Sequence, residues 1–71
     1  MKANELEIYD WFTIPAHPHC VFSRLPDDKF PERDHDTIVV QQVGPTLFSP
    51  ISQLSADTEV SLYKLNFVRV M

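Results

Sequence analysis

Residues 37–43 read Thr-Ile-Val-Val-Gln-Gln-Val, the stretch of the chain richest in β-branched side chains. Such side chains fit the pleated surface of a sheet better than the surface of a helix. Gly44 and Pro45 follow directly, and a glycine supplies the permissive backbone that a tight reversal requires. We therefore predict a strand at 37–43 and, after the reversal, a second strand at 46–49, the two forming a hairpin.

Two further strands are predicted before this hairpin. Residues 11–14 (Trp-Phe-Thr-Ile) form the first, after a bend at residues 9 and 10, where the alternation of apolar and polar side chains breaks. The two prolines of 15–18 predict a turn, because proline fits neither a helix interior nor a central strand. The next strand is predicted at 20–25, and a proline ends it.

The part of the chain after the hairpin permits two interpretations. Residues 51–57 are polar and predict a turn, or one short helical turn capped by Ser52 or Ser55. Residues 58–71 contain valine, tyrosine and phenylalanine, which favour strands interrupted by a turn or bulge near 63–66. The alternative is a helix capped at Ser55 with acidic residues in its first turn.

The predicted strands are short, and turns rather than helices connect them. A chain of 71 residues is long enough for one domain only. We therefore predict a single all-β domain over residues 1–71, a half-open barrel of five to six short strands. Its core is expected to contain the aromatic side chains of Tyr9, Trp11, Phe12 and Tyr63.

Several short motifs lie within residues 5–62. They are Leu6, Asp10-Trp11-Phe12, Phe22-Ser23-Arg24, Phe48-Ser49-Pro50 and Asp57-Thr58-Glu59-Val60. With them the chain resembles short uncharacterised proteins of phages and bacteria, including cyanobacteria, which have a Leu-x-x-x-Asp-Trp-Phe opening and a C-terminal Asp-Thr-x-Val strand. It departs from their pattern at Tyr9, where glycine is commoner, and in the acidic insertion before Thr37. The resemblance implies an SH3-like β fold and a phage-linked or accessory role, and it implies no activity.

Residues 26–36 are the most acidic segment, with five of the ten acidic residues of the chain. The segment is longer than the roughly 2–6 residues that usually connect elements, and loops of such length are functional or mobile. Its one aromatic residue, Phe30, either packs back onto the barrel or stays exposed as an anchor for a basic partner. The predicted partner-binding residues are Asp27, Asp28, Phe30, Glu32, Asp34 and Asp36.

The histidine and cysteine residues are of the types that bind zinc, but their spacing is not that of a structural zinc site. Zinc would accept His17, His19, Cys20 and His35 as ligands. The sequence lacks the Cys-x₂₋₄-Cys or His-x₃₋₅-His pair that structural zinc sites usually contain, so we predict no metal site and no cofactor. Cys20 begins an apolar strand and is expected to be a small buried thiol rather than a nucleophile.

Composition limits the classes of partner. The net charge is −4 and the basic residues are scattered, so direct binding to nucleic acid is disfavoured. No apolar stretch approaches the roughly 20 residues that span a bilayer, and a lone cysteine without a signal peptide is typical of a cytoplasmic protein.

Small domains usually need additional stabilisation, which here leaves self-association or docking on a larger assembly.

These observations predict a non-enzymatic protein-interaction or accessory module. One alternative is an acidic inhibitor that mimics nucleic acid, which requires clustered negative potential. A second alternative is a domain stabilised by zinc through the four ligands named above.

Overall fold

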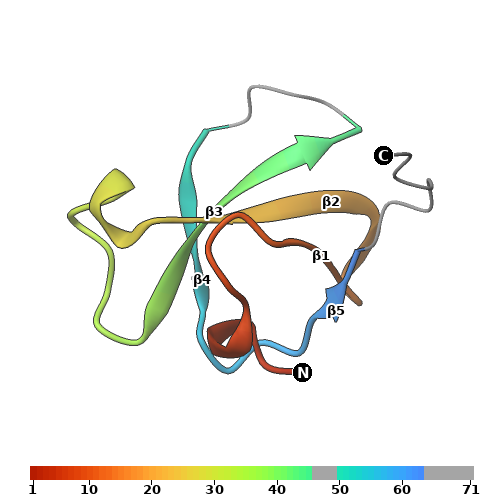
Figure 1. Cartoon of the computed structure of the whole chain (residues 1–71), viewed down its shortest axis with the longest axis horizontal. Helices are drawn as coiled ribbons and strands as arrows, with labels where there is room; N and C mark the ends of the chain where they lie inside the picture. Colours follow the sequence, from red (N-terminus) through yellow and green to blue (C-terminus); the bar gives the residue numbers. More distant parts are fainter. Residues whose placement is uncertain (46–49, 64–71) are drawn as a thin grey trace, which may run out of the picture.

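The computed structural model describes residues 1–45 and 50–63, and its main element is one antiparallel sheet (Figure 1). The sheet has five strands in the order β4-β3-β2-β1-β5. Their bounds are Trp11–Ile14 (β1), His17–Leu25 (β2), Thr37–Gly44 (β3), Ser52–Ser55 (β4) and Ser61–Leu62 (β5). Two 3-10 helical turns, η1 (Ala3–Glu5) and η2 (Asp27–Lys29), are the helical elements among the described residues. The fold is therefore mostly β, and β4 and β5 form the two edges of a sheet that is not closed.

The first hairpin joins β1 to β2 through a turn shorter than predicted. Only Pro15 and Ala16 form the turn, and β2 begins at His17, so the predicted turn at 15–18 was too long. Pro18 fits in this strand because β3 pairs with β2 only from Val21 onward. No neighbouring strand in the described sheet therefore needs the N–H that proline lacks on that side.

The strand predicted at 37–43 is confirmed as β3, and the next described strand is β4. β3 pairs with β4 in a register from Thr37↔Ser55 to Val40↔Ser52, so the predicted turn at 51–57 was wrong. The polar sequence of β4 suits an edge strand, of which only Leu54 packs against the core. The predicted strand at 46–49 lies outside the described residues.

The tail is a strand where the structure describes it. Ser61 and Leu62 form β5, which pairs with Thr13 and Phe12 of β1. This agrees with the strand interpretation of the tail and not with the helix. The remaining prediction for the tail, at 64–71, lies outside the described residues.

The main hydrophobic cluster lies on one face of the sheet, here called the inner face, whereas the fully buried Val39 alternates with Ile38 and Val40 and lies on the other face. The buried members of the cluster are Ala3, Leu6, Phe12, Ile38, Val40 and Val60. Backbone hydrogen bonds hold the first residues beside 56–60: the Ala3 N–H donates to the Thr58 carbonyl at 2.8 Å, and the Val60 N–H donates to the Met1 carbonyl at 2.8 Å. The N-terminal segment and the connection from β4 to β5 therefore cover the inner face together (Figure 1).

The bend predicted at residues 9 and 10 is confirmed, and it has an unusual backbone. Tyr9 has φ 72°, in the left-handed region that favours glycine. Its N–H donates to the Arg24 carbonyl at 2.6 Å, and the Arg24 N–H donates to the Asp10 carbonyl at 3.0 Å. The Arg24 guanidinium also donates to the carbonyl of Leu6, so β2 holds the bend from both sides.

The prediction that four aromatic side chains lie in the core is right for one of them. Phe12 is fully buried and stacks on Phe22, with ring centroids 5.7 Å apart. Tyr9, Trp11 and Tyr63 are exposed. Neighbouring strand residues point to opposite faces, so burying Phe12 places Trp11 on the outer face, where it pairs with Tyr63.

Among the described residues, no helix is long and apolar enough to cross a membrane.

Candidate functional site

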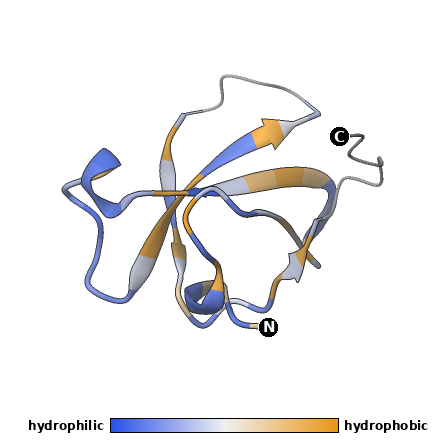
Figure 2. Ribbon diagram, viewed as in Figure 1, coloured by the Kyte–Doolittle hydropathy of each residue, from blue (hydrophilic) through white to orange (hydrophobic). Residues whose placement is uncertain are grey.

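The acidic segment 26–36 folds into a compact loop, here called the acidic loop, on the side of the sheet where β3 and β4 lie. Figure 2 shows it as the most continuous hydrophilic part of the ribbon. Successive turns shape it: the Lys29 N–H donates to the Pro26 carbonyl at 3.1 Å, and the Arg33 N–H donates to the Phe30 carbonyl at 3.0 Å. Local hydrogen bonds therefore define the path of its backbone.

Arg33 joins the beginning of the acidic loop to its end. Its guanidinium forms an ion pair with the Asp27 carboxylate at 3.1 Å. It also donates to the carbonyl oxygens of Thr37 at 2.9 Å and Asp34 at 3.1 Å. Asp27, one of the predicted partner-binding residues, is thus partly neutralised by the loop itself.

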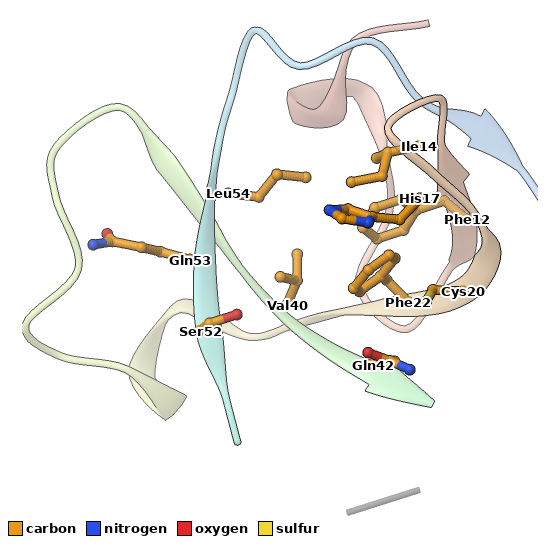
Figure 3. A pocket seen from close by; sticks show the side chains of 10 residues that line it. All are labelled: Phe12, Ile14, His17, Cys20, Phe22, Val40, Gln42, Ser52, Gln53 and Leu54. Atoms are coloured by element: carbon orange, nitrogen blue, oxygen red, sulfur yellow. The ribbon is translucent and has the colours of Figure 1, made fainter. Parts of the chain in front are cut away.

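Gln53 of β4 fixes the acidic loop to the edge of the sheet. The Gln53 side-chain oxygen accepts hydrogen bonds from the Asp34 N–H at 2.7 Å and from the Thr37 hydroxyl at 3.0 Å. The Gln53 amide nitrogen donates to the Asp34 carboxylate at 3.4 Å. Figure 3 shows Gln53 pointing from β4 toward this loop.

The predicted partner-binding residues differ in exposure. All five acidic ones, Asp27, Asp28, Glu32, Asp34 and Asp36, are exposed. Phe30 is half-buried, so it is not the freely exposed aromatic anchor of one sequence alternative. The carboxylates of Asp28 and Glu32 form no hydrogen bond or ion pair with any described residue. The structure thus brings the acidic residues together on one loop and leaves most of their charge facing solvent.

A cleft of about 360 Å³, here called the inner cleft, opens on the inner face (Figure 3). Its apolar walls come from the four strands β1 to β4, and the residues are Phe12, Ile14, Phe22, Val40 and Leu54. The remaining lining residues are His17, Cys20, Gln42, Ser52 and Gln53. Figure 3 shows the imidazole of His17 projecting into the cleft. Sequence reasoning missed the cleft because its residues are far apart in the chain and share no motif.

The predicted zinc ligands do not come together. His17 and Cys20 border the inner cleft, whereas His19 is exposed on β2 and His35 is exposed in the acidic loop. Within residues 1–45 and 50–63, no three His, Cys, Asp or Glu side chains gather closely enough to hold one metal ion. Cys20 is a free thiol and is half-buried rather than fully buried as expected. The geometry gives the zinc alternative no support.

Glu59 is a charged group with a distinct environment outside the acidic loop. Its carboxylate accepts a hydrogen bond from the Met1 ammonium at 2.7 Å. This hydrogen bond and the positive charge of the ammonium lower the pKa of Glu59 from its usual value. The contact fixes the N-terminal segment beside the connection from β4 to β5.

No protein-family model, curated protein or solved structure matches this chain. The function is therefore inferred from the two surfaces described above, the acidic loop and the inner cleft.

Proposed function

We propose that the protein is a non-enzymatic interaction module whose acidic loop contacts a basic surface on a protein partner. The observation that supports this is a loop whose backbone is fixed while its charges are exposed. Arg33 and Gln53 hold the backbone, and the carboxylates of Asp28, Glu32 and Asp36 face solvent.

A fixed backbone lowers the conformational cost of binding. A flexible loop must be ordered when it binds, and this ordering reduces affinity. The hydrogen bonds of Arg33 and Gln53 order the acidic loop before any partner arrives. Exposed charges of one sign then accelerate encounter with a surface of the opposite sign. A basic protein surface is the partner that satisfies both conditions.

The fold supports the same proposal. The strand order β4-β3-β2-β1-β5, with the connection 56–60 crossing the inner face, suits an SH3-like half-open barrel. The buried core of the described residues is small, and a small core benefits from docking on a larger assembly or from self-association. We propose a phage-linked accessory role, as the resemblance implies. We also propose that the module acts in the cytoplasm, where the thiol of Cys20 stays reduced.

An acidic mimic of nucleic acid is less well supported than the interaction module. A mimic requires dense, uninterrupted negative potential. In the acidic loop, Arg33 pairs with Asp27, and Lys29 adds a second positive charge. The mixed charges favour a protein contact of limited charge density.

The test is co-purification of partners from the native host with the full chain, tagged at its C-terminus so that the Met1 ammonium is unchanged. The loop variant is Asp28→Asn with Glu32→Gln. The matched control is Glu7→Gln with Asp57→Asn, two exposed acidic residues outside the loop. Each pair changes the net charge from −4 to −2.

We expect the loop variant to recover much less partner than the unaltered protein, and the control to recover the same amount. Rising salt should weaken the interaction because exposed charges are screened. Equal recovery by the loop variant and the control would show that the acidic loop is not the contact surface.

A further inference from the structure

The outer edge of β4 presents backbone groups that the described sheet does not use. The Ala56 N–H donates to the Asp36 carbonyl at 2.9 Å, and these residues continue the β3–β4 register. Bonded positions alternate along an antiparallel pair, so Leu54 and Ser52 bond β3 while the backbone of Gln53 points outward. The Ser55 N–H points outward as well, and the Ser55 carbonyl accepts a hydrogen bond from Thr58. Within the described residues, β4 has a strand on one side only.

Two different surfaces flank this edge. On the inner side, Ser52 and Leu54 line the inner cleft. On the outer side, Gln53 holds Asp34 of the acidic loop. Figure 3 shows Leu54 and Gln53 projecting from β4 in opposite directions, one toward the cleft and one toward the loop. In the sheet formed by residues 1–45 and 50–63, the unpaired edge of β4 therefore lies between the inner cleft and the exposed Asp34.

We propose that the outer edge of β4 binds an extended segment of a protein partner in which apolar and basic residues alternate. This inference rests on the proposed function and names the form of the partner that the acidic loop would recognise. Side chains of an added strand point alternately to the two faces of the sheet. One set would lie over the inner cleft, and the other would lie beside Asp34.

The two surfaces would also select the register of the added strand. The residues that line the inner cleft include no Asp, Glu, Lys or Arg, so a basic side chain placed there would lose hydration without gaining an ion pair. On the opposite side, the acidic loop offers the Asp34 carboxylate, 3.4 Å from the Gln53 amide nitrogen. A shift of the segment by one residue would exchange the two sets, placing basic residues in the cleft and apolar residues beside the carboxylate. The alternation itself is therefore what the site recognises.

The probe is a synthetic peptide, acetyl-Val-Lys-Val-Lys-Val-Lys-amide, titrated into the ¹⁵N-labelled full chain and followed by NMR. We expect the amide signals of Gln53 and Ser55 to shift on binding. The same peptide with glutamate in place of lysine should not bind. No shift at these two amides with the lysine peptide would overturn the inference.

A proline at position 55 tests the edge directly. Ser55→Pro removes an outward N–H without removing a β3–β4 hydrogen bond, whereas the control Ser55→Ala keeps that N–H. We expect affinity for the lysine peptide to fall about tenfold with proline and to stay unchanged with alanine. Unchanged affinity in folded Ser55→Pro would overturn the inference.

Methylated peptides repeat this test on the unaltered chain, which matters if Ser55→Pro does not fold. One peptide carries methyl groups on the backbone nitrogens of its lysines, and another carries them on the backbone nitrogens of its valines. In an added antiparallel strand the residues opposite Gln53 share its face, so the backbone N–H groups of the lysines would point to β4. Methylation of the lysine backbone nitrogens should therefore abolish binding. Methylation of the valine backbone nitrogens should spare it. Binding that tolerates both would contradict the proposed edge.

The two proposals fail in different ways. If Asp28→Asn with Glu32→Gln weakens partner recovery but Ser55→Pro does not, the acidic loop is the contact surface and the edge is not. If neither change affects recovery, both proposals are wrong. If Ser55→Pro alone weakens it, the edge binds the partner without the loop charges.

Discussion

The side-chain oxygen of Gln53 in β4 accepts a hydrogen bond from the backbone N–H of Asp34, at 2.7 Å, across 19 positions of sequence. The same oxygen accepts a second hydrogen bond from Thr37 at the start of β3. One amide side chain on an edge strand therefore fixes the end of the acidic loop to the sheet.

Replacing Gln53 with alanine should release the loop. The variant loses the acceptor for Asp34 and Thr37, and we expect the free energy of unfolding to fall by about 1 kcal/mol, as for a typical intramolecular hydrogen bond. Hydrogen exchange at the Asp34 amide should become faster. The control is Ser52→Ala, on the same strand and also exposed. Unchanged exchange at Asp34 in Gln53→Ala would contradict this role of Gln53.

Two neighbouring aromatic residues should differ sharply in their contribution to stability. Phe12 is fully buried and Trp11 is 38% exposed. We expect Phe12→Ala to cost about 3–5 kcal/mol, enough to unfold most of a domain this small. Trp11→Ala should cost about 1 kcal/mol, since it loses a ring contact with Tyr63 and only part of its burial. Urea denaturation measures both, and similar costs would show that the inner face is not the main core.

The backbone at Tyr9 should favour glycine. A left-handed backbone costs a non-glycine residue about 1–2 kcal/mol, and the Tyr9 side chain is 62% exposed, so little burial is lost on its removal. We expect Tyr9→Gly to leave stability equal or raise it by up to about 1 kcal/mol, despite the greater freedom of glycine in the unfolded chain. Tyr9→Val, with a β-branched side chain, should lower stability. The reverse order of thermal midpoints would disprove the left-handed backbone.

The contact between Glu59 and Met1 should make stability depend on pH. The hydrogen bond to the ammonium lowers the folded-state pKa of Glu59, so its contribution is present above the unfolded-state pKa. It is lost as the pH falls through the lowered folded-state pKa. The thermal midpoints of the unaltered protein and Glu59→Gln should therefore differ near neutral pH and converge in acid. A gap that stays constant with pH would rule out this linkage.

The sequence predicted correctly those strands whose own residues favour a strand. The β-branched run of β3 and the aromatic start of β1 determine those elements through their own side chains. β4 has no such signal, since its residues are polar and only Leu54 packs against the core. Its strand conformation comes from pairing with β3, which a single-segment pattern cannot show.

The candidate site was predicted in the same uneven way. Charge density alone indicated the acidic loop, because five carboxylates lie within one segment. Its attachment through Gln53 depends on a residue in another strand, and the inner cleft depends on side chains from several strands. Contacts of this kind depend on the order of the strands in the sheet. The sequence predicted a class of fold but not that order.

The hydrogen bonds between the N-terminal segment and 56–60 join parts of the chain that are nearly its full described length apart. Met1 and Glu59, for example, are separated by 58 positions. The hairpins from β1 to β4 form between neighbours in sequence, whereas this pairing requires closure of a long loop before it contributes any energy. The hairpins should therefore form first and the inner face should be covered last, so that partly folded chains expose Phe12 and Val40 until the final step.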